Sequence, residues 1–203
     1  MPFTTAEPES SETPPSLFRD AVLLLWELVK VVAVSLAIII PLRYFLIQPF
    51  YVKGASMEPN FEDHEYLIID ELTYRLRPPR RGEVVVFRYP LHPNDFFIKR
   101  IIGLPGEEVR IADGMLTIVP PGSPAGITLT EPYLPAGLKI EGTKTTKLGP
   151  DEYYLLGDNR SESLDSRYFG AVHRRFVTGR VVLRGWPLSK FDLFLQAPAY
   201  NVP

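Results

Sequence analysis

Apolar residues are unevenly distributed along this chain of 203 residues. The run from Val31 to Leu42 carries no charge, and the 20 residues from Val31 to Phe50 contain one, Arg43. Twenty helical residues span about 30 Å, the thickness of a bilayer core. The run is also apolar on all sides rather than along one stripe, as expected for a helix that faces lipid. The pattern predicts one transmembrane anchor helix in the region 17–48.

Two other interpretations of this run remain open. Its 12 uncharged residues are too few to span a bilayer and Pro41 would kink them, so the run also fits a buried core helix. A cleavable signal peptide has an apolar core of similar length, but Glu27 and the acidic leader differ from its basic flank. Lys30 and Arg43 flank the run and are able to snorkel toward the two interfaces, which favours an anchor. Cationic residues are balanced on the two sides, so charge alone leaves the orientation open.

The chain before and after this run has a different character. Residues 1–16 contain four prolines and several Glu, Ser and Thr residues, so they are unable to bury a core and are predicted to be a disordered tail. After Phe50 the apolar period changes toward two, and Gly or Pro residues separate short segments rich in β-branched and aromatic residues. These segments predict strands at 66–70, 83–89, 96–102, 108–111, 115–119, 152–156 and 176–183.

The strand pattern predicts a fold that is mostly β. We expect an antiparallel sandwich or barrel-like domain over residues 49–191, preceded by one N-terminal transmembrane helix. Residues 192–203 are predicted to form a C-terminal tail, with apolar residues that pack on the domain or on a membrane surface.

Composition and charge exclude several classes of function. The chain has 22 Lys and Arg residues against 24 Asp and Glu residues, so no global positive field favours a nucleic acid partner. The lack of cysteine excludes a disulfide framework, a thiolate zinc site and a cysteine nucleophile. His64, His92 and His173 lie far apart and lack the spacing of metal ligands. No Gly-rich phosphate loop is present, and we expect neither a metal nor another cofactor.

Two polar residues in apolar surroundings are the candidates for catalysis. Ser56 lies in the turn sequence KGASMEPNF, and Lys99 lies in the strand sequence FFIKRII. Strand alternation places Lys99 and Arg100 on opposite faces of the sheet. In most proteins such a lysine faces water and such a serine only forms a turn. If Lys99 instead faces inward, burial lowers its pKa, and the neutral amine is able to activate Ser56 without a histidine.

A third candidate feature is the polar sequence GDNRSESLDSRYFG at residues 157–170. One interpretation is a surface loop rich in Asx turns. The other interpretation is that Asp165 and Arg167 pair and hold Ser163 near the reactive groups, because such supporting contacts fix the rotamers of catalytic side chains.

Three separated segments share a resemblance to one family. GASMEPNF, RGEVVVFRYPLHPNDFFIKRIIGLPGEEV and GDNRSESLDSRYFGAV resemble, in order and spacing, the motifs of type I signal peptidases. These are membrane-anchored Ser-Lys proteases that remove signal peptides from exported proteins, and the resemblance extends from about Trp26 to Phe191. It implies that Ser56 is the nucleophile and Lys99 the general base.

The resemblance also implies supporting roles. Ser163 corresponds to a hydroxyl that hydrogen-bonds the lysine amine, and Gly54 stands where some relatives carry a hydroxyl that donates to the oxyanion. The family's structural polar residues correspond to Asp158, Asp165 and Arg167. Met57, Pro59 and Phe97 correspond to positions that shape the site. Val52, Phe61 and Ile98 would line shallow pockets that favour small residues at positions −1 and −3.

The implied partners are signal peptides of exported preproteins and the lipid bilayer, with no nucleic acid and no metal. The implied topology is a cytoplasmic N-terminus, one span of the cytoplasmic membrane and an extracytoplasmic catalytic domain. Two alternatives are weighed against it. A self-cleaving, repressor-like Ser-Lys protease would carry a DNA-binding segment and lack the anchor. A non-catalytic membrane-tethered β module would tolerate alanine at both Ser56 and Lys99.

Overall fold

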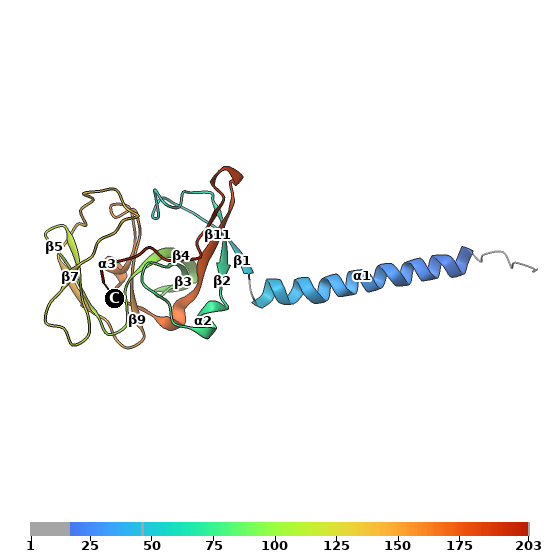
Figure 1. The fold of residues 1–203 in the computed structure, drawn as a ribbon, viewed down its shortest axis with the longest axis horizontal. Coiled ribbons are helices and arrows are strands. Elements are labelled where there is room, and N and C mark those ends of the chain that lie inside the picture. Colours follow the sequence, from blue (N-terminus) through green and yellow to red (C-terminus); the bar gives the residue numbers. More distant parts are fainter. Residues whose placement is uncertain (1–16, 46, 203) are drawn as a thin grey trace, which may run out of the picture. The chain divides into compact units, whose positions relative to one another are not determined.

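The structure is a computed structural model that describes residues 17–45 and 47–202. The tail predicted to be disordered, residues 1–16, lies outside the described residues. The chain separates into two compact units, residues 1–42 and 43–203, and each has its own architecture (Figure 1).

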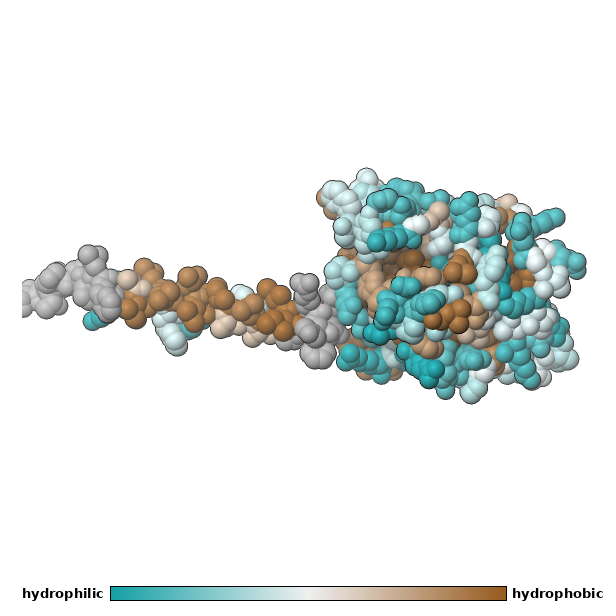
Figure 2. Space-filling model, turned by 180° about the vertical axis from the view of Figure 1, so that it is seen from behind, coloured by the Kyte–Doolittle hydropathy of each residue, from teal (hydrophilic) through white to brown (hydrophobic). Residues whose placement is uncertain are grey.

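The apolar run forms helix α1, Leu17–Phe45. The segment Arg19–Ile40 is long and apolar enough to cross a membrane, and none of its 18-residue apolar window is buried. Apolar side chains cover most of the visible surface of residues 19–40 (Figure 2). A core helix of a globular domain would instead be mostly buried. The helix continues through Pro41, and the side chains of Glu27 and Lys30 form an ion pair of 2.6 Å on its surface.

The second unit consists of antiparallel sheets, which confirms the predicted fold class. The larger sheet has the order β1-β2-β11-β3-β4-β9-β10, and β12 pairs with β11. Its strands are β1 (Ile47–Tyr51), β2 (Tyr66–Asp70), β3 (Val84–Tyr89), β4 (His92–Gly103), β9 (Glu152–Leu156), β10 (Val172–His173), β11 (Val177–Trp186) and β12 (Asp192–Leu193).

A smaller sheet has the order β7-β6-β5-β8. Its strands are β5 (Glu108–Ala112), β6 (Met115–Val119), β7 (Ile127–Thr128) and β8 (Lys144–Lys147). The remaining elements are single turns of helix between strands: α2 (Thr73–Leu76), α3 (Ser166–Phe169), η1 (Arg174–Phe176) and η2 (Leu188–Lys190).

The seven predicted strands all coincide with observed strands, but some boundaries differ. Strand β4 begins at His92, before the predicted apolar segment, because it pairs with β3 as far as Tyr89. Strand β1 was not predicted, since it contains Pro49 and its first two residues fall in the region 17–48 assigned to the anchor. An edge strand tolerates proline because one of its sides needs no N–H donor.

The segment 192–203, predicted as a tail, packs on the domain over most of its described length. The Phe194 N–H donates to the Val182 carbonyl at 2.8 Å, and the Asn201 side chain accepts from the Thr130 N–H at 2.9 Å. Val202 is buried in the core beneath the smaller sheet. Aliphatic burial and sheet pairing therefore make this segment part of the domain.

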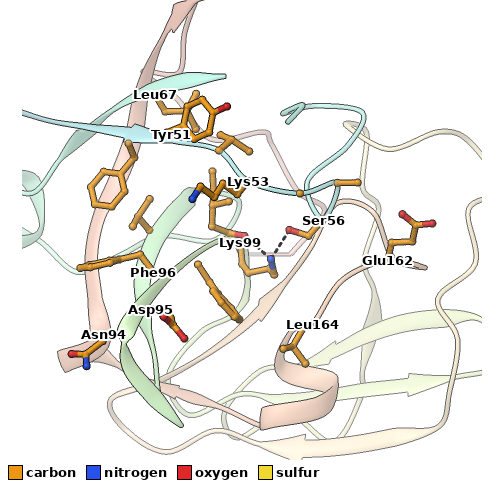
Figure 3. Close-up of a pocket in the computed structure, with 17 residues that line it drawn as sticks. Tyr51, Lys53, Ser56, Leu67, Asn94, Asp95, Phe96, Lys99, Glu162 and Leu164 are labelled. Carbon is orange, nitrogen blue, oxygen red and sulfur yellow. Dashed lines mark hydrogen bonds between the residues drawn. The ribbon is translucent and has the colours of Figure 1, made fainter. Parts of the chain in front are cut away.

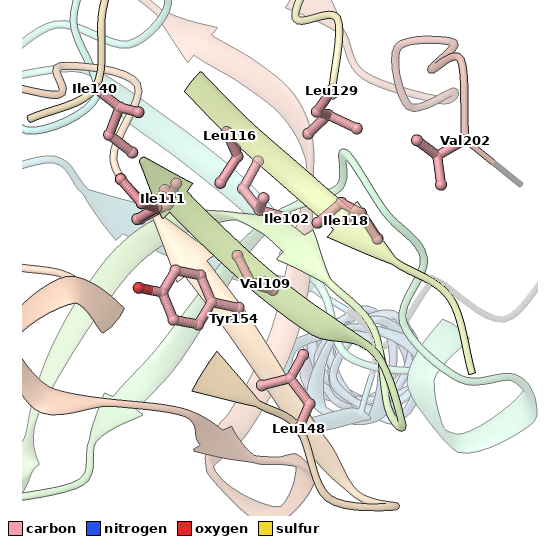
Figure 4. Packing of buried hydrophobic residues seen from close by; sticks show 11 residues of the cluster. Ile102, Val109, Ile111, Leu116, Ile118, Leu129, Ile140, Leu148, Tyr154 and Val202 are labelled. Carbon is pink, nitrogen blue, oxygen red and sulfur yellow. The ribbon is translucent and has the colours of Figure 1, made fainter. Parts of the chain in front are cut away.

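Apolar residues cover both faces of the central strands. Within β4, Ile101 belongs to one buried cluster and Ile102 to another, and Leu155 and Leu156 of β9 divide in the same way. The cluster that contains Ile102 fills the space against the smaller sheet (Figure 4). A strand buried on both faces has a continuous apolar sequence rather than an alternating one. This explains the runs FFIKRII and EYYLL, and it means that a polar residue in the buried second half of β4, residues 99–103, has to be accommodated inside the domain.

A buried ion pair joins the turn before β3 to the turn after β4. The Arg81 guanidinium donates to both carboxylate oxygens of Glu107, at 2.9 and 2.5 Å, and to the Ile102 carbonyl at 2.5 Å. Both side chains are about 95% buried, with exposed fractions of 5% and 6%. The Glu107 carboxylate also accepts from the Leu104 N–H at 2.7 Å.

We predict that Glu107→Ala lowers the free energy of unfolding by about 3–5 kcal/mol, because it leaves the Arg81 charge buried without its carboxylate. Glu108→Ala is the matched control. Its partner is Arg110 in an exposed pair, and its loss should cost less than about 1 kcal/mol. Thermal unfolding of both full-length variants in the same detergent measures the difference. Equal losses of stability would contradict a structural role for the Arg81–Glu107 pair.

Candidate active site

A cavity of about 570 Å³ opens on the second unit between three segments (Figure 3). The end of β1 and the following turn contribute residues 50–56, β4 contributes residues 94–99, and the loop after β9 contributes Glu162 and Leu164. The two remaining lining residues, Leu67 of β2 and Val86 of β3, are apolar. The cavity contains both Ser56 and Lys99, which the sequence singled out as candidates for catalysis.

The Lys99 Nζ and the Ser56 Oγ lie 2.7 Å apart and are hydrogen-bonded. The Nζ also donates to the Ile98 carbonyl at 2.8 Å and lies 5.6 Å from the centre of the Phe97 ring. Lys99 is only 3% exposed. The lysine therefore faces the interior of the domain and not water.

Burial lowers the pKa of Lys99 to about 8, because desolvation disfavours the charged amine. The negative charges of Asp165 and Asp158 act in the opposite direction and raise this pKa. Neither carboxylate forms a hydrogen bond with the amine among the described residues, since each one is occupied by an arginine. An appreciable fraction of Lys99 is therefore neutral near pH 8.

The neighbouring cation, Arg100, has a different environment on the opposite face of β4. Its guanidinium makes a two-pronged contact with Asp158 at 2.8 and 2.5 Å, and it donates to the Gly82 carbonyl at 2.9 Å. It also stacks over the Tyr133 ring at 3.9 Å. The two adjacent cations of FFIKRII are thus separated by the alternation of the strand, as predicted from the sequence.

Packing on buried apolar residues and hydrogen bonds from Asn159 fix the turn that carries Ser56. Met57 and Phe61 are fully buried in the cluster beneath it, and the Phe61 N–H donates to the Met57 carbonyl at 3.0 Å. The Asn159 backbone N–H donates to the Ser56 carbonyl, and its side-chain amide donates to the Ala55 carbonyl, both at 3.1 Å. The polar loop 157–170 therefore holds the serine turn directly.

An ion pair closes this loop on itself. The Arg167 guanidinium contacts both oxygens of Asp165 at 2.9 Å, and the same carboxylate accepts from the Gly157 N–H at 3.1 Å. Asp165 is fully buried and also caps α3 by accepting from the Arg167 N–H. Of the two interpretations of this loop, the buried ion pair agrees with the one in which Asp165 and Arg167 pair, and it does not agree with a surface loop.

Ser163 does not make the hydrogen bond to the Lys99 amine that the resemblance implied. Its Oγ is buried and has no hydrogen-bond partner within the described part of the chain. The amine of Lys99 instead bonds to Ser56 and to the Ile98 carbonyl. Ser163 lies against Gly157, where an added Cβ would come within 2.1 Å of its Oγ.

The residues expected to bind substrate divide into two groups. Val52, Phe97 and Ile98 line the cavity, as does Gly54. Met57 and Phe61 do not line it, because they are buried beneath the serine turn, with exposed fractions of 0% and 1%. Sequence reasoning does not separate these cases, since an apolar residue has the same pattern whether it lines a cavity or supports it.

Several lining residues were not identified from the sequence. The missed set consists of Phe50, Tyr51, Lys53, Ala55, Leu67, Val86, Asn94, Asp95, Phe96, Glu162 and Leu164. Most of them flank the predicted Ser56 turn or the predicted strand at 96–102. Recognition of β1 and of the early start of β4 would have found four of them, Phe50, Tyr51, Asn94 and Asp95. Asn159 was also missed, although it lies in the polar sequence that had been singled out.

The histidines do not gather into a site. His64 pairs with Asp63 on the surface at 2.8 Å. Across residues 17–45 and 47–202, no group of three or more His, Cys, Asp or Glu side chains is placed to hold a metal ion.

Comparison with known proteins gives the class of this molecule. A family model described as "Signal peptidase, peptidase S26" matches residues 25–186. The probable signal peptidase I-2 of Synechocystis sp. is 39% identical over 82% of this chain and 76% of that protein. Signal peptidase I of Leptolyngbya laminosa is 34% identical over 87% of each chain. The crystal structure of a signal peptidase I from Enterococcus faecalis V583 has a TM-score of 0.43 and 31% identity, and covers 51% of this chain and 97% of that chain.

The family model and these two relatives define the protein as a serine peptidase, and hence a hydrolase. The chain belongs to the signal peptidase family, peptidase S26, and cleaves signal peptides. The resemblance found in the sequence motifs is thereby confirmed. Neither the repressor-like protease nor the non-catalytic module agrees with this family.

We predict that Gly157→Ala lowers kcat/KM for a preprotein by at least about tenfold, because a misplacement of about 1 Å in a reacting group is sufficient for such losses. The added Cβ would lie 2.5 Å from the Ser56 carbonyl oxygen and displace the serine turn. Gly185→Ala is the control, since Gly185, like Gly157, has no left-handed backbone and its Cβ would meet only the Tyr66 carbonyl oxygen, at 3.9 Å. Thermal unfolding of both variants is measured alongside. Full activity in a folded Gly157→Ala variant would contradict the packing described.

Proposed function

We propose that the protein is a membrane-bound signal peptidase in which Ser56 is the nucleophile and Lys99 the general base. The observation that carries this proposal is the 2.7 Å contact between the Ser56 hydroxyl and a buried amine whose pKa is lowered. A nucleophile within hydrogen-bond reach of a base of suitable pKa is the common requirement of covalent hydrolysis. No metal or other cofactor is needed for this chemistry.

The reaction consists of two acyl transfers. Neutral Lys99 accepts the Ser56 hydroxyl proton while the Oγ bonds to the scissile carbonyl carbon. The carbon–nitrogen bond then breaks, and the lysine ammonium gives its proton to the leaving amine. In the second half, neutral Lys99 accepts a proton from water, the hydroxide adds to the ester carbon, and Ser56 leaves with the proton returned by the lysine. Each half therefore restores the amine to its neutral form.

The developing oxyanion requires hydrogen-bond donors, each worth on the order of 3 kcal/mol. The backbone N–H of Ser56 is the proposed first donor. Gly54 carries no side-chain hydroxyl, so a second donor has to come from another group. Asp158, Asp165, Arg167 and Ser163 are proposed to act at a distance, by holding the serine turn and the buried strand in place.

The proposed selectivity for small residues at positions −1 and −3 follows from the walls of the cavity. Val52, Val86 and Ile98 present branched side chains next to the Ser56–Lys99 pair. These residues are held by the packed core beneath them, so a larger substrate side chain would overfill the space. The substrates are signal peptides of exported preproteins.

The proposed membrane topology uses α1 as the anchor. Its apolar segment Arg19–Ile40 would span the lipid bilayer of the cytoplasmic membrane once. The N-terminus would be cytoplasmic and the β domain extracytoplasmic, where translocated preproteins emerge.

We predict that Ser56→Ala and Lys99→Ala each lower cleavage of a preprotein ending its signal in Ala-x-Ala by at least about a thousandfold. The thermal transition should be retained, since neither change removes an ion pair. Ser123→Ala and Lys139→Ala replace the same residue types outside the cavity and should cleave normally. Near-normal cleavage by either cavity variant would rule out the proposed pair, and gel analysis of the preprotein digest measures all four.

We also predict that kcat/KM of the full-length enzyme rises with pH and reaches half of its plateau near pH 8, the lowered pKa of Lys99. Below this value the fraction of neutral amine, and with it the rate, falls about tenfold per pH unit. The measurement is initial rates of preprotein cleavage across this range in one mixed buffer. A rate that stays constant from about pH 6 to about pH 9 would show that Lys99 is not the base.

A further inference from the structure

The charged residues that line the cavity are divided by the position of Ser56. Figure 3 shows Lys53 and Asp95 on the side of Lys99, together with the aromatic side chains of Tyr51 and Phe96, whereas Glu162 lies on the other side of Ser56. The residues Lys53, Asp95 and Glu162 are exposed. The end of the cavity near Lys99 therefore has aromatic walls and two charges that offset each other. The end beyond Ser56 carries the single negative charge of Glu162.

Glu162 is held in a defined position relative to the serine turn. Its backbone N–H lies 3.3 Å from both the carbonyl and the side-chain oxygen of Asn159. Asn159 in turn donates to the carbonyls of Ser56 and Ala55. Within the described residues, no ion pair or hydrogen bond occupies the Glu162 carboxylate. A fixed backbone thus presents an uncompensated negative charge at the mouth of the cavity.

The direction of a bound substrate follows from the apolar half of the cavity. If small residues at −1 and −3 occupy the space between Val52, Val86 and Ile98, the signal peptide lies on that side of Ser56. The chain after the scissile bond must then leave on the side of Glu162. In an extended chain, alternate side chains face the same surface. The residue at +2 shares the face of −1 and −3, and it points toward the enzyme where Glu162 lies.

We propose that Glu162 is a specificity-determining residue that recognises the charge of the second residue of the mature protein. A Lys or Arg at +2 is favoured by attraction to the carboxylate, and an Asp or Glu is disfavoured by repulsion. This inference rests on the proposed function of the cavity and adds a recognition site on the mature side of the bond. Its magnitude is modest, since both groups remain partly hydrated.

The test uses three preproteins that differ only at +2, with Lys, Gln or Glu, and the full-length enzyme in detergent at low ionic strength. For the wild-type protein, we expect kcat/KM for the Lys substrate to exceed that for the Glu substrate about two- to fivefold. Glu162→Gln should bring this ratio close to one, and Glu162→Lys should invert it. Added salt at about 0.5 M should reduce each preference, because it screens exposed charges.

Asp95→Lys is the matched control, because it makes the same change of charge within the same cavity but on the signal-peptide side. We expect it to leave the ratio between the Lys and Glu substrates unchanged. A ratio that is the same in wild type and Glu162→Lys, or that changes equally in Asp95→Lys, overturns the proposal. These results differ from a failure of the proposed function, in which Ser56→Ala would still cleave the Gln substrate.

Discussion

The burial of the Lys99 amine against the Ser56 hydroxyl is the contact on which the rest of the site depends. Burying a lysine amine in its charged form costs free energy unless an opposite charge compensates it, so burial otherwise favours the neutral form. The structure places Asp158 and Asp165 near enough to influence this amine, yet it commits each carboxylate to an arginine. The amine is left with a hydroxyl and a carbonyl as its hydrogen-bond partners. A fully paired lysine would remain charged and would be of no use as a base.

Two neighbouring ion pairs explain how the domain keeps the Lys99 amine without a carboxylate partner. Arg100 and Asp158 join β4 to the loop after β9, and Asp165 and Arg167 close that loop. Both pairs are buried, so the loss of one partner would leave a charge without compensation. They fix the loop that holds the carbonyl of Ser56 through Asn159. The same loop carries Glu162, which connects the support of the nucleophile with the proposed recognition of the mature chain.

Much of the fold was predictable because the strands are rich in β-branched and aromatic residues and are separated by Gly or Pro. The pairing of the polar loop was partly predictable, since Asp165 and Arg167 are two residues apart. Other features depend on contacts that sequence spacing does not encode. Arg160 binds Glu131 from 29 positions away, and Val202 enters the core of the smaller sheet.

The roles of apolar residues near the serine were the least predictable part of the site. Val52 and Phe61 both belong to the same buried cluster, but only Val52 also lines the cavity. The distinction depends on the depth of each residue beneath the turn, which is a property of packing. The bond between Ser163 and Lys99 that the resemblance implied is not present among the described residues, since the amine bonds to Ser56 and to the Ile98 carbonyl and the Ser163 hydroxyl is without a partner.

The most direct test of the account is a titration of the Lys99 amine itself. NMR of full-length protein with isotope-labelled lysine would follow its ionisation, and Lys99→Arg would assign the resonance. The account predicts a midpoint near pH 8, because the amine is desolvated beside Ser56. A midpoint near the ordinary lysine value of about 10.4 would contradict the central claim that the domain maintains a neutral amine as the base.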